Sequence, residues 1–443
     1  MDVEGFVRRL RAEGKPGEEI QALLADHIRR LKPVPEDYAA EFARAVREEV
    51  VFSERAQGDI FEFTPAGVAM GEFGVGSRGK GDFYAHRKIA EIIGRTTAAV
   101  GVEEMDDGGV VQAGGRWIAV TVDGMHSRLS DYPFLAGFHA TRATLRDAYV
   151  MGARPVALFS DIHVADDGDV AKIFDYTAGI TAVSEAMGVP LVAGSTLRIG
   201  GDMVLGTRMT GCVGAVGVVS HLTPRRAAVP GDLILMTSGS GGGTIATAAI
   251  YSGTPEVVDR TLNLDFLRAA QALLDSDILD EIHAMTDVTN GGLRGDAHEM
   301  AATAKARIVI QDRHLRTLVD PVVLAMLDRL HIDYLGVSLD ALLVVAPPAA
   351  ADRVLRVVRE AGVPMEVIGS VERGPAGAVL VVDEREQDFT PRFRESAYTP
   401  LKKVVDRAGR DFDEMRAGVD RAAAAAVAKK QRVLSRITGP GRR

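Results

Sequence analysis

The 443-residue chain lacks features that define several classes of protein. It has one cysteine, Cys212, which excludes an intramolecular disulfide and a cysteine zinc cluster. We therefore expect a reducing, cytoplasmic setting. The first residues, MDVEGFVRRLRAEG, contain no apolar run of the kind found in signal peptides. The chain has no stretch of about 20 apolar residues, so we expect no contact with a membrane.

Short motifs of large enzyme classes are missing as well. The absence of G-x-x-x-x-G-K-[ST], H-R-D and D-F-G argues against a P-loop protein and a protein kinase. The absence of G-x-S-x-G and H-E-x-x-H argues against a serine hydrolase and a zinc protease. Histidines are sparse, and we interpret His126, His139 and His163 as structural or surface residues. We interpret Cys212 as a packing residue within an apolar strand.

The composition is globular, and the charge is unevenly distributed. Hydrophobic residues make up 47% and charged residues 26%, which excludes wholesale disorder. The net charge is −9, yet residues 401–443 hold 12 basic and 5 acidic residues. The acidic body argues against broad nucleic-acid binding and suits a protein that holds metal cations and acts on small anions through them. For the basic tail we favour a solvated, alanine-rich helix, with RNA or an acidic partner as the alternative.

Periodicity divides the chain into four parts. Residues 1–55 show three amphipathic helical patterns, and a glycine-rich loop follows over about 56–84. Strand and helix patterns then alternate in two halves, and PGDLILMTS opens the second. This pattern predicts an α+β or α/β protein with two main domains. We place the four parts at 1–55, 56–225, 226–395 and 396–443.

Carboxylates stand at the ends of predicted strands. Asp106 and Asp107 lie in MDDGGVV, Asp123 in VTVDG and Asp287 in MTDVTNGG. Mg²⁺ prefers hard oxygen ligands of this kind, and the adjacent glycines leave space around them. Each aspartate could instead be a turn residue that bonds to its own backbone. Composition and spacing leave these two interpretations open.

Two glycine-rich segments are candidate phosphate-binding loops. GVGSRG, residues 74–79, matches G-x-G-x-x-G, but no convincing strand precedes it, which disfavours a dinucleotide oxidoreductase. We favour a mobile loop whose Arg78 and Lys80 close over phosphates, with a plain solvated loop as the alternative. TSGSGGGT, residues 237–244, is either a phosphate cradle at a helix N-terminus or a turn that allows close packing.

Several segments, in order along the chain, carry a family resemblance. They are MDDGGVV, WIAVTVDGM, SDYPFLAGFHATRATLRDAYVMGARPVAL, VPLVAGSTLR, PGDLILMTSGSGGG and MTDVTNGGLRGDAHEMA. As a set, these segments resemble the superfamily of aminoimidazole-ribonucleotide (AIR) synthetase. It also includes formylglycinamidine-ribonucleotide synthetase, selenophosphate synthetase, thiamine-monophosphate kinase and the hydrogenase-maturation dehydratase. The resemblance covers roughly residues 70–395.

The resemblance implies an α+β, two-domain AIR-synthetase-like fold. Its N-terminal domain would pair into a dimeric β-barrel, its C-terminal domain would form an α/β sandwich, and residues 1–55 would add a helical cap. It further implies a homodimer that binds ATP with Mg²⁺ in a groove between domains and dimer partners. The metal carboxylates would be those of Asp106, Asp107, Asp123 and Asp287.

The resemblance also assigns residues around the nucleotide. The segment before the first strand would be a glycine-rich lid that contains Gly76 and Gly79, with Arg78 and Lys80 as its catalytic cations. The other residues expected near the nucleotide are Asp147, Gly194, Ser195 and Thr196.

The chain departs from the family pattern in two places. Its lid has no cysteine, unlike the lid of selenophosphate synthetases, and AGST replaces the G-G-H-S that contains a histidine. We therefore expect a Mg²⁺-dependent, ATP-using kinase or ligase-type synthetase that acts on an unassigned small-molecule acceptor. The alternative is a non-catalytic nucleotide-binding scaffold or regulator on the same fold.

Overall fold

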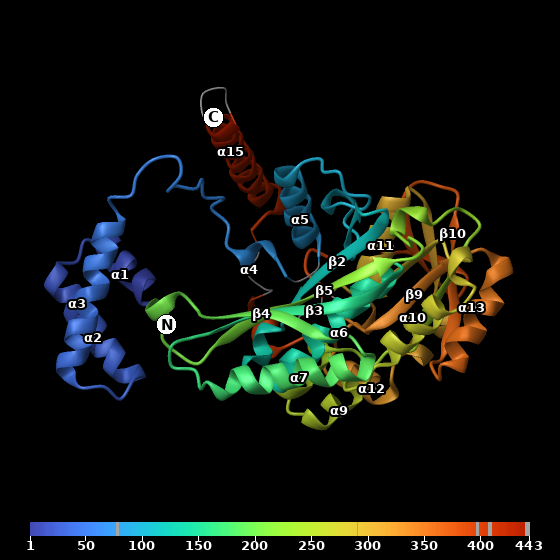
Figure 1. Ribbon diagram of the computed structural model, residues 1–443, viewed down its shortest axis with the longest axis horizontal. Helices are drawn as coiled ribbons and strands as arrows, with labels where there is room; N and C mark the ends of the chain where they lie inside the picture. The colour runs from blue at the N-terminus through green and yellow to red at the C-terminus, as the bar shows by residue number, and fades with distance from the viewer. Residues whose placement is uncertain (77–78, 290, 396–397, 406–409, 439–443) are drawn as a thin grey trace.

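The computed structural model describes residues 1–76, 79–289, 291–395, 398–405 and 410–438. The chain forms an N-terminal helical unit, two mixed α+β domains built on separate sheets, and a C-terminal helical extension (Figure 1). The expected two-domain α+β architecture is confirmed. None of the helices in the described ranges has the length and apolar character needed to cross a membrane.

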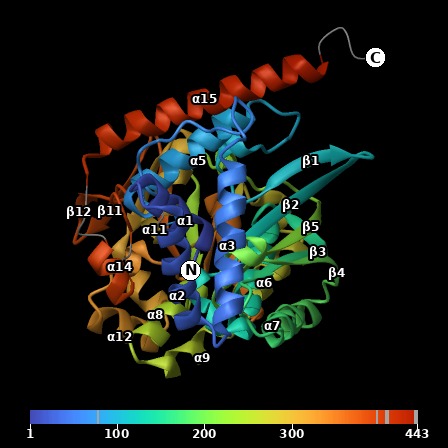
Figure 2. The ribbon, with the colours of Figure 1, turned by 90° about the vertical axis from the view of Figure 1, so that its left-hand side faces the viewer.

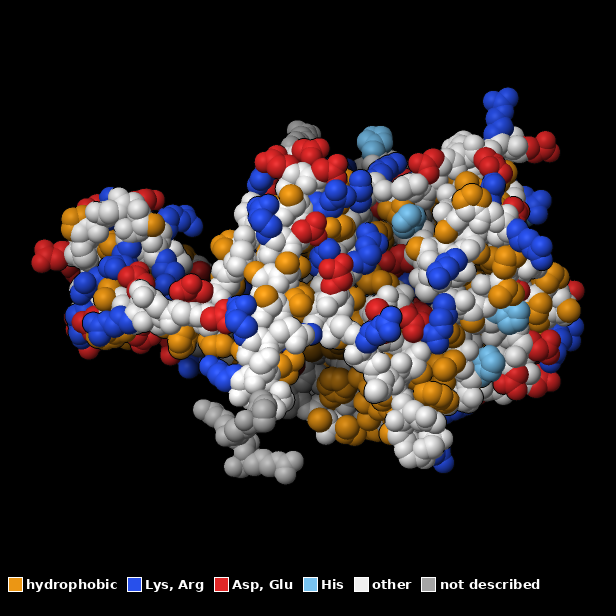
Figure 3. All heavy atoms as spheres, turned by 90° about the horizontal axis from the view of Figure 1, so that it is seen from above, with side chains coloured by type: hydrophobic (Ala, Val, Ile, Leu, Met, Phe, Trp, Pro, Cys, Tyr) orange, Lys and Arg blue, Asp and Glu red, His pale blue; other side chains and the backbone are white. Residues whose placement is uncertain are grey.

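Three helices form the N-terminal unit: α1 (Val3–Ala12), α2 (Gly17–Leu31) and α3 (Glu36–Ser53). Their apolar faces bury one another in a core of their own, which also takes in Leu205 from the body of the protein. Lys32 pairs with Asp167 at 2.6 Å and ties the unit to the first α+β domain. Seen from above, the unit is a separate lobe with side chains of both charges on its surface (Figure 3).

The predicted loop over residues 56–84 is helical in part, which corrects the sequence interpretation. It contains α4 (Met70–Phe73) and the first residues of α5 (Lys80–Ile93). Gly81 belongs to this glycine-rich segment, and a Cβ atom there would lie 1.8 Å from the carbonyl oxygen of Phe73. The glycine therefore permits close contact between α4 and α5 rather than loop motion.

The first domain is built on a five-stranded sheet of order β1-β2-β5-β3-β4. Its strands are β1 (Gly109–Ala113), β2 (Arg116–Gly124), β3 (Ala153–Val164), β4 (Leu191–Arg198) and β5 (Met209–Val219). Only β3 and β4 run parallel, and the other neighbours are antiparallel. Helices α6 (Pro133–Val150) and α7 (Ala171–Met187) pack against one face of this sheet. The sequence did not indicate the short strand β1.

The second domain is built on a seven-stranded sheet of order β12-β11-β8-β10-β6-β9-β7. Its strands are β6 (Leu233–Thr237), β7 (Ala284–Val288), β8 (Arg307–Gln311), β9 (Ala341–Ala346), β10 (Met365–Glu372), β11 (Gly377–Val382) and β12 (Arg385–Asp388). Helices α10 (Asp265–Asp275) and α13 (Pro348–Glu360) share one core with the sheet. Helices α8 (Gly243–Tyr251), α11 (Gly292–Ala304) and α12 (Pro321–Arg329) share the core on its other face, and the short α9 (Val258–Thr261) follows α8.

The C-terminal extension consists of α14 (Pro400–Val405) and α15 (Phe412–Thr438). The predicted terminal helix is confirmed, but it is not wholly solvated, because it packs along α5 (Figure 2). The hydroxyl of Tyr84 donates to Asp420 at 2.6 Å, and Lys88 pairs with the same carboxylate at 3.1 Å. The rings of Phe73 and Phe412 stack with their centroids 5.7 Å apart.

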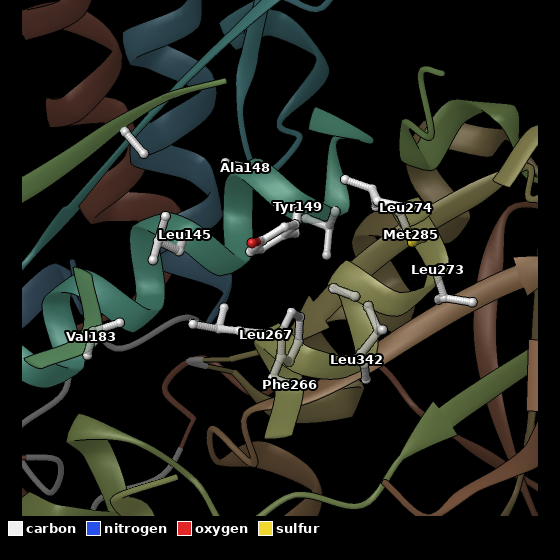
Figure 4. Close-up of a cluster of buried hydrophobic side chains, with 14 of the residues drawn as sticks. Leu145, Ala148, Tyr149, Val183, Phe266, Leu267, Leu273, Leu274, Met285 and Leu342 are labelled. Carbon is white, nitrogen blue, oxygen red and sulfur yellow. The ribbon is translucent and has the colours of Figure 1, made fainter. Parts of the chain in front are cut away.

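A continuous apolar core joins the two domains through α6 (Figure 4). Leu145, Ala148 and Tyr149 of α6 belong to the same buried cluster as Phe266 and Leu267 of α10. This joint fixes α6 between the two sheets, so the side chains on its remaining face keep a defined position relative to both.

We expect loss of packing at this joint to destabilise the whole protein. Leu145→Ala removes a fully buried side chain and should lower the free energy of unfolding by about 2–5 kcal/mol. Thermal unfolding followed by circular dichroism measures the change. Leu31→Ala is the control, because Leu31 is 52% exposed and should have little effect. Equal shifts for the two variants would contradict this role of α6.

Candidate functional site

A cavity of about 550 Å³ lies where the two domains meet, a size typical of small-molecule sites. It is lined by α5, β2, α6, the start of α8, β7 and α11, and by the segments before β1 and β9. Residues from distant parts of the sequence therefore face one space.

The predicted carboxylates meet in this cavity. Asp106 and Asp107 reach it from the segment before β1, Asp123 from the end of β2, and Asp287 from β7. Asp147 joins them from α6. The structure thus brings together five predicted site residues from four separate segments.

The sequence did not indicate that arginines would hold these carboxylates. Arg225 pairs with Asp107 at 2.5 Å and with Glu299 of α11 at 3.1 Å, and its Nε donates to Thr286 at 2.9 Å. Arg146 of α6 pairs with Asp287. Arg225 lies outside the segments that carry the family resemblance, and the resemblance gave Arg146 no role, so only the three-dimensional fold assigns the two arginines to the site.

A second ion-pair group lies further along the cavity. Asp340, which precedes β9, pairs with both Arg142 and Arg146 of α6. Arg142 also donates to the carbonyl oxygen of Thr261. Arg146 thereby connects Asp287 to Asp340, and a continuous ion-pair network follows α6.

Negative charge exceeds positive charge around the cavity. Three described lining residues are arginines, and seven are carboxylates: Asp106, Asp107, Asp123, Asp147, Asp287, Glu299 and Asp340. Burial raises the pKa of Asp107 to about 7 against the effect of Arg225, and Asp287 adds to the rise. Burial also raises the pKa of Asp147, with Asp123 as the next cause. A buried set of oxygen ligands with excess negative charge suits a divalent cation.

The carboxylates are held in ion pairs rather than grouped for a metal. Among the described residues, no three Asp, Glu, His or Cys side chains form a group that could hold an ion as they stand. The guanidinium group of Arg225 pairs with Asp107, and that of Arg146 pairs with Asp287. These ion pairs are one reason why the carboxylates do not form a metal-binding group with one another. The chemistry of the donor set fits Mg²⁺, while the assignment of individual ligands stays a prediction.

The predicted lid residues lie away from the cavity. The ammonium group of Lys80 is 4.6 Å from the centroid of the Phe412 ring, and its backbone N–H donates to Arg392. A Cβ atom on Gly79 would lie 2.3 Å from the carbonyl oxygen of Phe393, and the Gly76 N–H donates to the Asp82 carboxylate. Arg78 lies outside the described residues. This lid packs against the C-terminal extension.

Gly194, Ser195 and Thr196 also lie away from the carboxylates. They belong to β4, which is separated from β2 by β5 and β3. With Tyr176 they line a second cavity of about 300 Å³. Within one chain, the structure does not bring them to the carboxylate cavity.

The glycine-rich segment at 237–244 serves close packing and also reaches the cavity. A Cβ atom on Gly239 would lie 2.3 Å from the carbonyl oxygen of Leu339, which supports the packing interpretation. Gly242, Gly243 and Thr244 line the cavity at the start of α8.

Two histidines that we interpreted as structural or surface residues also line the cavity. His126 and Thr244 share a hydrogen bond of 2.9 Å, and burial lowers the pKa of His126 to about 4. His139 is buried on α6. No sequence motif distinguished either residue.

Comparison with protein families agrees with the fold. Two family models match: AIR synthase related protein, N-terminal domain, over residues 105–219, and AIR synthase related protein, C-terminal domain, over residues 229–382. The chain belongs to the AIR-synthase-related family. The models leave the N-terminal helices, the lid and α15 outside the matched ranges.

Individual relatives differ in how much of the chain they match. Uncharacterized protein MJ1416 of Methanocaldococcus jannaschii is 49% identical over 98% of each chain. A selenide, water dikinase of Citrifermentans bemidjiense is 34% identical over 52% of this chain and 65% of its own length. A thiamine-monophosphate kinase of Pyrococcus horikoshii is 25% identical over 50% of this chain and 72% of its own.

Solved structures share the fold at low sequence identity. Hydrogenase maturation protein HypE in complex with ATP is 21% identical with a TM-score of 0.54, over 65% of this chain and 88% of that one. AaThiL complexed with AMPPCP and TMP is 16% identical with a TM-score of 0.54, over 71% and 96%. These structural similarities show that this chain shares the fold of both proteins.

The raised pKa of Asp107 predicts a pH-dependent effect of its neutral analogue. A carboxyl whose pKa rises from 3.8 to about 7 on folding stabilises the native state fully below pH 4, and this contribution disappears as the pH reaches 7. Asp107→Asn imitates the protonated carboxyl, so the variant should gain several degrees in melting temperature relative to wild type between pH 4.5 and 7.5. Calorimetry in a chelating buffer measures this gain. A difference that does not change with pH would contradict the shift.

Proposed function

We propose that the protein is a Mg²⁺-dependent, ATP-using phosphoryl-transfer enzyme that acts on a small-molecule acceptor. The observation that carries the proposal is the convergence of Asp107, Asp123, Asp147 and Asp287 on one buried cavity. Relatives named as a selenide, water dikinase and a thiamine-monophosphate kinase support ATP as the phosphoryl donor. The structure of HypE in complex with ATP supports the same choice.

Magnesium would be held by Asp107, Asp123 and Asp287, with Asp106 and Asp147 beside them. When bound, the ion supplies positive charge that offsets the charge of the phosphate oxygens in transfer. The excess of carboxylates over arginines around the cavity supports this assignment, because a cation would offset their mutual repulsion.

The protein's own residues then position the reaction. Arg225 and Arg146 orient Asp107 and Asp287 through charge-assisted hydrogen bonds. Gly108 lets the backbone next to Asp107 pack closely against β2, since a Cβ atom there would lie 2.9 Å from Thr121 Cγ2. In our proposal Lys80 leaves the face of Phe412 and closes over the phosphates together with Arg78. This motion also excludes water.

Calorimetric titration with a non-hydrolysable ATP analogue tests the proposal without knowledge of the acceptor. Mg²⁺ should strengthen binding to the wild-type protein by about tenfold or more. Asp123→Asn and Asp287→Asn should each abolish this Mg²⁺ dependence and lower ATP turnover by about 10²-fold. Asp280→Asn is the matched control, because the Asp280 side chain is 87% exposed. Mg²⁺-independent binding by the wild type, or full turnover in both site variants, would overturn the proposal.

The uncovered face of the five-stranded sheet supports a homodimer. Val120 and Val122 of β2 and Leu197 of β4 are exposed on the face opposite α6 and α7, where Phe159 of β3 lies level with Val122 in the register. Apolar side chains exposed on an uncovered sheet face favour an interaction surface. We propose that a second copy packs its sheet here, which would also cover Ser195.

A charge on this face should separate the subunits. Leu197→Glu buries an unpaired carboxylate in the proposed interface and should shift the protein from dimer to monomer in light-scattering chromatography. Val322→Glu, at an exposed position of α12 in the second domain, should leave the dimer intact. A dimer that persists in Leu197→Glu would place the interface elsewhere.

The position of Lys80 favours the second candidate, a nucleotide-binding scaffold or regulator. Its ammonium group lies on Phe412 rather than in the cavity. A scaffold would bind the ATP analogue with Mg²⁺ but show no turnover with any acceptor. Turnover that falls in Lys80→Met while analogue binding persists would decide for the enzyme.

A further inference from the structure

Helix α5 forms part of the cavity wall and presents a histidine to it. His86 and Ile89 line the cavity. Asp82 precedes His86 by one helical turn, so the three side chains lie on one stripe of the helix. The proposed binding of Mg²⁺ and ATP uses neither Asp82 nor His86, and this polar pair therefore has no assigned role.

Neighbouring helices fix the position of α5. Phe83 is buried, and a Cβ atom on Gly295 of α11 would lie 3.5 Å from Cζ of its ring. Lys88 pairs with Asp420 of α15 at 3.1 Å. Because α5 is held by both α11 and α15, His86 keeps a defined position in the cavity wall.

A buried carboxylate stands beside the imidazole ring of His86. Asp82 is 1% exposed, and its Oδ1 lies 3.9 Å from Nε2 of His86. The N–H of Gly76 donates to the same oxygen at 3.0 Å, which helps to hold the carboxylate in place. A carboxylate at this distance attracts the imidazolium ion that forms when the ring takes a proton. A buried aspartate plays the same part beside the histidine base of a serine hydrolase.

The other histidines among the described lining residues hold protons poorly. Burial lowers the pKa of His126 to about 4, and its ring shares a hydrogen bond of 2.9 Å with Thr244. Burial also lowers the pKa of His139 well below its ordinary value. A general base works best when its proton affinity suits the working pH, so neither ring suits this role at neutral pH.

The carboxylates of the cavity are engaged in other ways. Glu299 pairs with Arg225, and Asp340 pairs with Arg146. The other lining carboxylates belong to the set proposed to hold Mg²⁺ or stand beside it. Histidine is the side chain best suited to exchange protons at neutral pH. His86 is also 36% exposed, so it can return a proton to water.

We propose that His86 is the general base of the reaction and that the acceptor presents a hydroxyl group. As the acceptor oxygen attacks the γ-phosphorus of ATP, a ring nitrogen of His86 takes its proton. A new oxygen–phosphorus bond forms, the bond from the γ-phosphorus to the bridging oxygen breaks, and its electron pair leaves with ADP. His86 then releases the proton to solvent. The inference rests on the proposed function, since it assigns a catalytic residue to that reaction.

ATP hydrolysis tests the assignment on the full-length protein, because water is the smallest acceptor with a hydroxyl group. Phosphate release is measured with Mg²⁺ and ATP alone. His86→Ala should lower the rate by about 10²-fold, the usual contribution of a positioned base. Affinity for the ATP analogue with Mg²⁺ should change less than about twofold, since the base acts in the transition state. His86→Gln, which keeps a polar side chain but takes no proton, should lose the same activity.

A matched control and chemical rescue separate catalysis from structure. His221→Ala is the control, because His221 is 33% exposed and lies 3.6 Å from Asp280 but does not line the cavity. The control should keep the wild-type rate of phosphate release. Imidazole in the buffer should raise the rate of His86→Ala by about tenfold, because the free base fits where the side chain was removed. It should leave the rate of His86→Gln unchanged.

Failure of the inference and failure of the proposed function give different results. A wild type that does not bind the ATP analogue with Mg²⁺ would overturn the proposed function, and the inference with it. A wild type that binds the analogue but releases no phosphate would overturn the role of His86 alone. Equal rates for His86→Ala and the wild type would do the same and transfer the role to a carboxylate such as Asp147. A lowered rate that imidazole does not raise would show that His86 acts through structure, which also contradicts the inference.

Discussion

The structure depends on the double role of α6. One face of this helix is apolar and joins the two domains through a common core, as Leu145 and Tyr149 do beside Phe266. Another face is polar and lines the cavity from His139 to Asp147. Because packing in the core is close and specific, small displacements of one domain relative to the other cost free energy. The side chains on the polar face of α6 therefore keep well-defined positions. The site is therefore located by hydrophobic packing, although its own residues are charged.

The charges of the site are costly to bury, and the fold accommodates them in a specific way. Arg146 and Arg225 each contact several carboxylates, so a few cations hold many anions. Arginine suits this role because its planar guanidinium group donates in several directions at once. Burial raises the pKa values of Asp107 and Asp147, and repulsion from neighbouring carboxylates adds to the rise. Buried ion pairs seldom add stability over apolar packing, which points to function as the reason they are kept.

The sequence predicted the elements and residues that local patterns encode. A strand-end acid followed by glycine, as at Asp123, is recognisable because strand periodicity and turn chemistry are local properties. Arg225, Glu299 and His139 could not be assigned, since their roles arise only when distant segments meet. The lid was interpreted as mobile because glycine signals freedom in a sequence. Here Gly79 and Gly81 serve close backbone contact, which only the neighbouring Phe393 and Phe73 reveal.

The C-terminal extension packs on the lid and on α5. Asp420 of α15 holds Tyr84 and Lys88 of α5, while Phe412 stacks on Phe73 and lies under Lys80. Any motion that carries Lys80 to the cavity must therefore break contacts with α15 or move α15 as well. Neither element falls within the matched family domains, yet the alignment with the Methanocaldococcus jannaschii relative covers nearly the whole chain. The C-terminal extension and the lid thus pack together as one unit, outside the family domains that build the site.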